Sequence, residues 1–142
     1  MPGIVDTPGN FVQRFKIDAE ATAGTADTWP LCVVDALAAT GWTITGVNWI
    51  PNAIVTGAAT NNFALGLVDV GAAGAGTQAI TTVKTYASGT NSVANVAEAL
   101  PLSATAANLL AVDGDVLVLA RTVNGTGLAS PRGTLEVLYR YR

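Results

Sequence analysis

Short apolar or alternating segments recur along the whole chain, and residues that favour turns separate them. This pattern constrains the fold more than any other feature of the sequence. In FVQRFKID, residues 11–18, the basic side chains fall on one face of a period-two alternation, which predicts a half-exposed β-strand. Three further segments are rich in β-branched and aromatic residues and are also predicted to be strands: 41–50, 62–70 and 133–141.

Roughly seven to nine such segments are joined by Gly, Asn, Ser and Thr turns, without the helix–strand alternation of a βαβ protein. We therefore predict an all-β fold, a β-sandwich or jelly roll of about eight short antiparallel strands. Only residues 92–100 show helical spacing, and Pro101 would end a helix there. We expect at most one short helix at residues 92–100, and the longer segment 92–114 could equally hold two short strands. Gly46 is expected to mark a β-bulge.

The chain is expected to form one β domain, residues 11–142, preceded by an extended segment. Residues 1–10, MPGIVDTPGN, contain two Pro-Gly pairs, which resist helix formation. This segment is interpreted either as a frayed terminus or as an arm that wraps a neighbouring subunit.

Charged residues are unusually sparse and unevenly placed. They make up 12% of the chain, about half of the usual ~25%. No charged residue occurs between Asp35 and Asp69, and only Lys84 and Glu98 occur between Asp69 and Asp113. Because charged surfaces usually keep a small domain soluble and monomeric, we expect identical subunits or a larger partner to cover much of this surface. The alternative is a monomer with a neutral Thr- and Asn-rich surface.

The composition also excludes several classes of function. The chain has no histidine and one cysteine, so Ser-His-Asp and Cys-His catalysis are excluded and a zinc site is improbable. Cys32 is expected to be a small buried residue, with a reactive or cross-linked thiol as the alternative. A net charge of −3 without Lys or Arg clusters argues against nucleic-acid binding. We expect neither a cofactor nor enzymatic activity.

No membrane association is expected, because no apolar run approaches the ~20 residues that a transmembrane helix needs. The N-terminus has no basic segment followed by an apolar one. We therefore expect no signal peptide, and folding in a cytoplasm.

Two short motifs invite a functional interpretation, but a structural one fits better. The loop GAAGAG, residues 71–76, has its glycines in the wrong order for a dinucleotide-binding turn, and a strand-like segment follows it. We expect a flexible loop between strands. Asp113-Gly114-Asp115 lacks the further oxygen ligands of an EF-hand, so we expect a tight turn before a strand.

Aromatic and basic residues are the candidates for recognition. Trp29, Trp42 and Trp49 are expected in the core or at an interface, or alternatively as a platform for sugar stacking. Arginines gather near the C-terminal segment, either as a solvated face or as a weak positive patch that meets an acidic surface; they are Arg121, Arg132, Arg140 and Arg142. We expect eight residues at contacts with identical subunits or a larger partner: Ile4, Val5, Phe11, Trp42, Trp49, Tyr139, Tyr141 and Arg142.

The segment LLAVDGDVLVLARTVNGTGLASPRGTLEVLYRY, residues 109–141, resembles the ending of small head and tail proteins of tailed bacteriophages. Those proteins have jelly-roll-like folds. The resemblance is one of strands and turns, so no ligand is carried to a named position. It implies a capsid decoration (cement) protein, often a trimer on the outer shell, or a related fibre or head-spike protein. The implied partners are identical subunits and the lattice of the major capsid protein, and the implied location is the virion.

Two functions therefore follow as expectations. The first is a structural virion protein that stabilises a capsid, with residues 1–10 reaching a neighbour. The second is a receptor- or carbohydrate-binding module of a fibre or tail, in which the tryptophans would form the binding platform.

Overall fold

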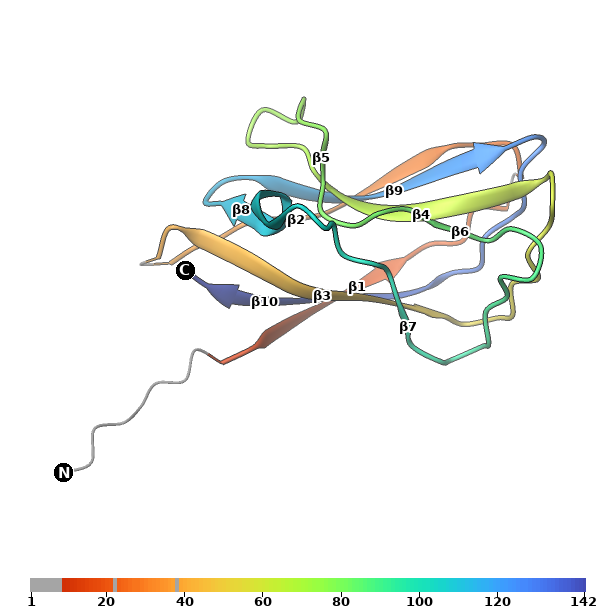
Figure 1. Ribbon diagram of the computed structural model, residues 1–142, viewed down its shortest axis with the longest axis horizontal. Coiled ribbons are helices and arrows are strands. Elements are labelled where there is room, and N and C mark those ends of the chain that lie inside the picture. Colours follow the sequence, from red (N-terminus) through yellow and green to blue (C-terminus); the bar gives the residue numbers. More distant parts are fainter. Residues whose placement is uncertain (1–8, 22, 38) are drawn as a thin grey trace.

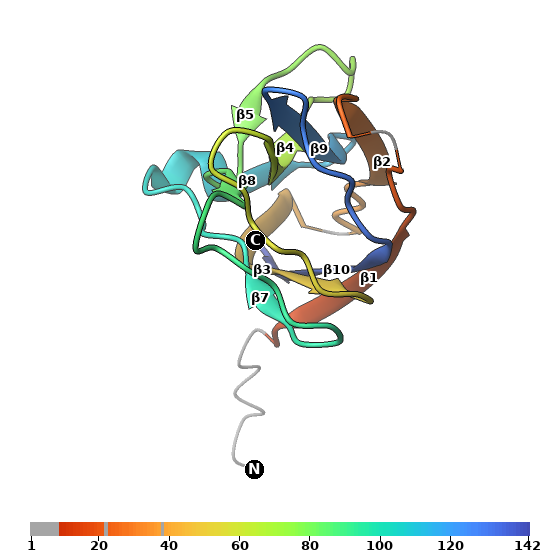
Figure 2. The same cartoon turned by 90° about the vertical axis from the view of Figure 1, so that its right-hand side faces the viewer.

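The computed structural model describes residues 9–142 with the exception of residues 22 and 38, and two antiparallel sheets pack face to face in it (Figures 1 and 2). The first, here called sheet 1, has the order β1–β10–β3–β7, and β8 also pairs with β3. Its strands are β1 (Phe11–Ile17), β10 (Gly133–Tyr141), β3 (Gly41–Pro51), β7 (Glu98–Ala99) and β8 (Leu110–Val112).

The second, here called sheet 2, has the order β2–β9–β4–β5, and β6 also pairs with β4. Its strands are β2 (Asp27–Val33), β9 (Val116–Asn124), β4 (Asn62–Asp69), β5 (Gln78–Ala79) and β6 (Lys84–Thr85). The predicted all-β sandwich is thus confirmed.

The connectivity is that of a jelly roll. The short strands β5 and β6 pair with successive parts of β4, and β7 and β8 pair with successive parts of β3. Counted as two interrupted strands, they bring the total to eight. The chain passes from one sheet to the other at nearly every connection and returns to lie beside its start, where β10 pairs with β1.

Alternation along the long strands builds the core. Leu135, Val137 and Tyr139 of β10 lie directly opposite inward-facing residues of β3, and residues directly opposite in an antiparallel pair share a face. Sheet 2 contributes inward leucines and Phe63 in the same way. The largest buried apolar side chains are Trp42, Trp49, Tyr86, Phe63, Ile44, Leu65, Leu67, Ile80, Leu100, Leu117 and Leu119.

The charge-free run of residues 36–68 contains β3 and β4, which are interior strands of the two sheets. Seven of the eight residues of β4 are buried. The sequence predicts that identical subunits or a larger partner cover the uncharged surface of these strands. The correction is that much of the run lacks charge because the subunit itself buries it.

Two local expectations of the sequence can be compared with the structure. Residues 92–100 contain no helix among the positions described; they lead into β7, and a 3-10 turn follows at Ala106–Leu109. Therefore the alternative of two short strands holds for residues 92–114, which contain β7 and β8. The register between β3 and β10 shifts so that Thr45, next to Gly46, has no direct partner, which confirms a bulge at this glycine.

Candidate interaction surfaces

Four aromatic side chains of sheet 1 form a continuous cluster that runs from the core to the surface. The rings of Trp42 and Tyr139 are stacked with centroids 3.9 Å apart. Phe11 stacks on Tyr139 at 5.7 Å and meets Tyr141 edge-on at 5.0 Å. Phe11 is 45% exposed and Tyr141 is half-buried. The structure therefore joins four of the residues that we expected at contacts.

Several of those expected residues are not available at the surface. Trp42 and Trp49 are each 1% exposed and Tyr139 is 5% exposed, because all three point between the sheets. Their assignment to a contact surface is therefore corrected to a place in the core. Arg142 is exposed, and its backbone N–H donates a hydrogen bond of 3.1 Å to the backbone oxygen of Gly41. Ile4 and Val5 lie outside the described residues.

Burial also affects the proposed sugar platform. Trp42 Nε1 donates a hydrogen bond of 2.9 Å to the backbone oxygen of Asp35, and both faces of its ring are covered by protein. Trp29 is half-buried and packs against the core. Trp42 and Trp49 consequently present no exposed flat surface on which a sugar ring could stack.

The outer face of sheet 2 is uncharged. Opposite pairs such as Thr28–Ala120 and Ala64–Thr122 point away from the core. Among the described residues, the outward positions of β2, β9, β4, β5 and β6 are occupied only by neutral side chains. They are Thr28, Pro30, Val33, Val116, Val118, Ala120, Thr122, Asn124, Asn62, Ala64, Gly66, Val68, Ala79 and Thr85. Four of them, Asn62, Ala64, Gly66 and Val118, are themselves buried by their neighbours. We call this surface the neutral face.

The neutral face contains a shallow hollow of about 430 Å³. Asn62, Ala64 and Thr122 line it, with Thr85 and Val83 beside them. Val83 is 58% exposed. The hollow offers small apolar groups and uncharged hydrogen-bonding groups, which suits contact with neutral protein surface.

The outer face of sheet 1 has a different character. Arg14 and Lys16 of β1 and Arg140 of β10 point outward on it, with one carboxylate, Glu136. Arg14 Nε lies 2.8 Å from Glu136 Oε1. The hydrogen bond from Arg14 lowers the pKa of Glu136, so this carboxylate stays ionised. We call this surface the basic face.

Arg121 was expected to belong to the arginine group near the C-terminal segment. Instead it is 1% exposed. Its guanidinium donates to the backbone oxygens of Thr25 and Leu128 and lies 5.2 Å from the ring centroid of Phe63. Burial lowers its pKa. The role of Arg121 is to join the loop before β2 to the loop after β9, and its assignment to a surface patch is corrected.

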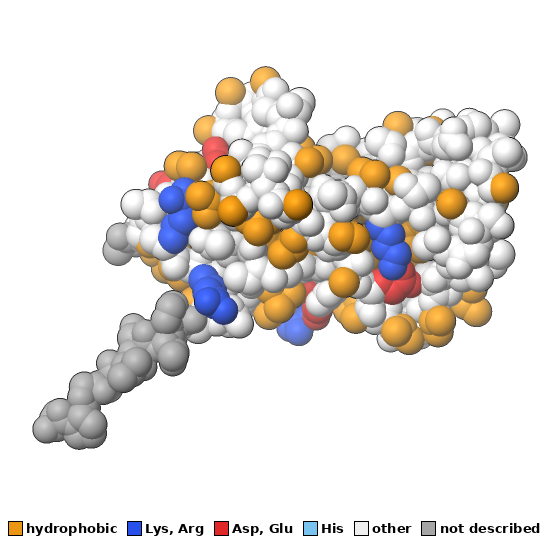
Figure 3. Space-filling view, viewed as in Figure 1, with side chains coloured by type: hydrophobic (Ala, Val, Ile, Leu, Met, Phe, Trp, Pro, Cys, Tyr) orange, Lys and Arg blue, Asp and Glu red, His pale blue; other side chains and the backbone are white. Residues whose placement is uncertain are grey.

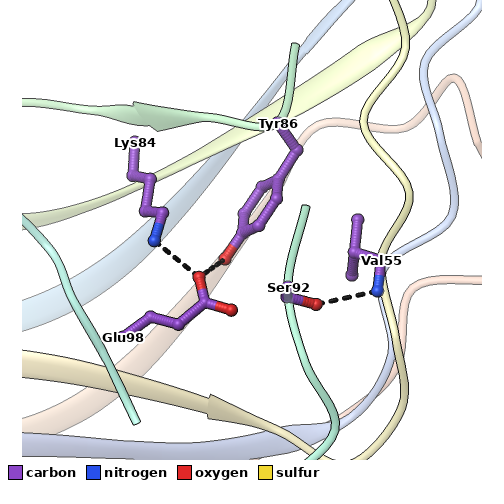
Figure 4. A network of polar contacts seen from close by, with 5 residues as sticks. All are labelled: Val55, Lys84, Tyr86, Ser92 and Glu98. Carbon is purple, nitrogen blue, oxygen red and sulfur yellow. Dashed lines mark hydrogen bonds and ion pairs between the residues drawn. The ribbon is translucent and has the colours of Figure 1, made fainter. Parts of the chain in front are cut away.

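A polar network links the two sheets at one side of the sandwich (Figure 4). Glu98 Oε2 of β7 accepts hydrogen bonds from Lys84 Nζ of β6 at 2.5 Å and from the Tyr86 hydroxyl at 3.1 Å. Burial and the neighbouring Glu98 raise the pKa of Tyr86. Close by, Ser92 Oγ accepts from Val55 N at 2.7 Å. The sequence offered one signal for this network, since Lys84 and Glu98 are alone in a long uncharged region.

The two motifs behave as expected from their sequence. GAAGAG forms the loop between β4 and β5, with Gly71 at φ 68° and Gly74 at φ 72°. Asp113-Gly114-Asp115 forms a turn before β9, closed by a bond of 3.0 Å from Asp115 N to Val112 O. A loop between strands is thus confirmed for the first motif, and a tight turn before a strand for the second.

The thiol and the acidic groups offer no further site. Cys32 is half-buried, and burial raises the pKa of its thiol to about 11, so the thiolate is rare at neutral pH. Within residues 9–142, apart from the two omitted positions, no three His, Cys, Asp or Glu side chains gather as a metal would require.

No family model matches the chain, and no curated protein or solved structure is significantly similar to it. None of the helical segments described is long and apolar enough to cross a membrane.

On the side of the molecule drawn in Figure 3, charged side chains form a few separate spots on a surface that is otherwise uncharged. The outward residues of the two sheets thus define two candidate interaction surfaces, the neutral face of sheet 2 and the basic face of sheet 1.

Proposed function

We propose that the protein is a non-enzymatic structural subunit that works by associating with other protein, as a decoration protein that stabilises a bacteriophage capsid. Its partners in this proposal are identical subunits, forming a trimer, and the lattice of the major capsid protein. Its location is the capsid surface of the virion.

The observation that carries the proposal is the neutral face. It lies on the outer side of β2 and β9 and continues over the neighbouring strand β4, where Val68 is the partly exposed residue. None of the described outward residues there bears a charge. The contrast with the basic face matters, because a general shortage of charge would affect both faces equally. A sheet face without charge costs less to dehydrate than a charged one, and contact between copies brings no like charges together.

Two further observations support the virion setting. Residues 109–141, which resemble the ending of small phage head and tail proteins, form β8, β9 and β10 with the turns between them. Jelly rolls are also common among viral capsid domains. Since one fold serves many functions, these observations support the proposal by analogy, and the neutral face supports it by its surface chemistry.

The proposed mechanism is the sum of many weak contacts. Each subunit buries neutral surface against neighbours, and a ligand that binds only the assembled lattice stabilises that lattice. Each subunit makes several contacts with the shell. Once one contact has formed, the others form more readily because they are already held close to their partners.

Light scattering on the purified protein tests self-association. We expect a mass of three times 14.4 kDa. The variant Thr28→Glu/Thr85→Glu/Thr122→Glu places three carboxylates on the neutral face, at exposed positions, and should be monomeric. The matched control Thr28→Ser/Thr85→Ser/Thr122→Ser keeps the face neutral and should keep the wild-type mass. A wild-type protein that stays monomeric at high concentration would contradict the self-association.

Co-sedimentation with empty phage capsids tests the lattice partner. We expect wild-type protein to sediment with capsids and to raise the temperature at which they rupture. A glycan array separates the second expected function: binding to a glycan, but not to any capsid, would replace the decoration role with a receptor-binding one. The burial of Trp42 and Trp49 removes two of the three tryptophans from that platform, so this observation favours the decoration role.

A further inference from the structure

The cationic side chains of this chain are concentrated on one side of the fold. Of its seven Lys and Arg residues, Lys84 is bound to Glu98 at the edge of the sandwich and Arg121 is buried. The remaining five lie on β1, on β10 or directly beside β10: Arg14, Lys16, Arg132, Arg140 and Arg142. A protein with a net charge of −3 therefore presents a positively charged sheet face.

Cross-strand neighbours leave most of this charge uncompensated. Arg14 is directly opposite Glu136, and the two form an ion pair. Lys16 is opposite Thr134, and Arg140 is opposite Thr43. Three cations against one carboxylate leave a charge of +2 on the outward positions of these strands.

The basic face is not simply solvated polar surface. Val12 of β1 is 42% exposed and lies opposite Leu138 of β10, between the charged positions. Arg140 Nε donates to Asn10 Oδ1 at 2.7 Å, which holds its guanidinium in place. Fixed cations around exposed apolar groups are typical of a protein interface, where Arg is enriched.

We propose that the basic face binds an acidic patch on another protein, the carboxylate-bearing surface of the lattice on which this subunit sits. The chemistry follows from the charge pattern, and the choice of a lattice as the partner depends on the proposed function. Arg14 and Arg140 offer the planar donor pairs that match carboxylates. Nucleic-acid binders commonly make about 6–10 phosphate contacts, and this face offers fewer cations than that.

In this proposal the two faces bind different partners. The neutral face contacts other copies of this chain, where equal charges would repel one another. The basic face contacts a different protein, whose acidic surface supplies the charges that this face lacks. Electrostatic attraction of this kind mainly speeds association and fixes orientation, and salt weakens it.

A crossed pair of variants tests the assignment. Arg14→Gln/Lys16→Gln/Arg140→Gln removes three positive charges from the basic face, and Thr28→Glu/Thr85→Glu/Thr122→Glu adds three negative charges to the neutral face. Both lower the net charge by three. The probe is immobilised polyglutamate at about 20 mM salt, where surface charges are weakly screened, with folding checked by chemical unfolding.

We expect wild-type protein to bind polyglutamate and high salt to release it. The basic-face variant should bind about tenfold more weakly or not at all, since its attraction is lost, while keeping the wild-type mass in light scattering. The neutral-face variant should be monomeric but should still bind polyglutamate, because it keeps Arg14, Lys16 and Arg140. Glu136→Gln removes the one carboxylate of the face and should strengthen binding, so the test holds even if the triple variant fails to fold.

Three results would overturn the inference. Wild-type protein could fail to bind polyglutamate, the two triple variants could lose binding equally, or duplex DNA or phosphatidylserine vesicles could bind through these residues while polyglutamate does not. A different result would contradict the proposed function alone. The wild-type protein would then be monomeric and would not bind capsids, but it would still bind polyglutamate through Arg14, Lys16 and Arg140.

Discussion

Lys84 and Glu98 form an ion pair of 2.5 Å that joins sheet 2 to sheet 1. Their side chains are 22% and 11% exposed, so the pair is largely removed from water. Both residues occupy strands of two residues, β6 and β7, which have few backbone bonds to hold them. The pair therefore ties together the most weakly paired part of the sandwich.

Replacing one partner of this pair should cost more than replacing both. Lys84→Met leaves the Glu98 carboxylate buried without its cation and should destabilise the fold by about 3 kcal/mol. The double variant Lys84→Met/Glu98→Leu removes both charges and should recover much of that loss. Urea unfolding of the wild type, both single variants and the double variant gives the coupling energy. Additive single losses would show that the pair contributes no coupling.

Arg121 should be one of the least replaceable residues of the chain. Arg121→Met leaves the carbonyl oxygens of Thr25 and Leu128 without their donor, and unsatisfied buried groups cost about 1–3 kcal/mol each. We expect a loss of about 3 kcal/mol or more in denaturant unfolding. Arg132→Met, at an exposed position, is the control and should change stability by less than about 0.5 kcal/mol. Equal effects of the two substitutions would contradict the structural role of Arg121.

Asp69 makes stability depend on pH. Burial raises the pKa of its carboxyl above the ordinary 3.8, and the nearby Asp115 raises it further. In the folded state the carboxyl therefore holds its proton to a higher pH than in the unfolded state. Its contribution to stability is greatest below pH 3.8 and is lost as the pH rises through the folded pKa.

Asp69→Asn should consequently be more stable than wild type at pH 7, with a smaller difference toward pH 3. The amide oxygen can still accept the hydrogen bond from Gly71 N that Asp69 Oδ1 accepts at 2.7 Å. Urea unfolding between pH 3 and pH 7 measures the difference. A variant that is less stable than wild type at pH 7 would show that the hydrogen bond outweighs the buried charge.

The fold was accessible from the sequence because its signals are local. Period-two alternation in residues 11–18 and 133–141 identified strands that the structure places side by side as β1 and β10. Turn residues marked the loop at residues 71–76 and the turn at Asp113-Gly114-Asp115. Such signals depend on nearest neighbours along the chain, and so they survive without knowledge of pairing.

The surfaces were less accessible, because they depend on which strands are neighbours. The charge-free run was interpreted as surface, but β3 and β4 proved to be interior strands. No feature of the sequence around Arg121 distinguishes it from a surface arginine. Its burial depends on the loops that contain Thr25 and Leu128, which are distant from each other in the sequence. The separation of a neutral face from a basic face requires the register of Arg14 with Glu136 and of Thr28 with Ala120, which no single segment reveals.

Gly127 should be intolerant of any side chain, because its backbone combines two constraints. Its φ is +71°, and a Cβ there would lie 1.8 Å from the carbonyl oxygen of Ala23. Gly71 has a similar φ of +68° but open space around the same position. It therefore serves as a matched control that carries only the conformational penalty.

In Gly71→Ala, the left-handed backbone alone should cost about 1–2 kcal/mol. In Gly127→Ala, the same penalty is joined by a clash with backbone that cannot move without displacing the loop that Arg121 holds. Thermal unfolding should therefore show a clearly larger loss for Gly127→Ala than for Gly71→Ala. Equal losses would mean that the two loops do not approach as closely as the structure has them, and that the anchoring by Arg121 is correspondingly weaker.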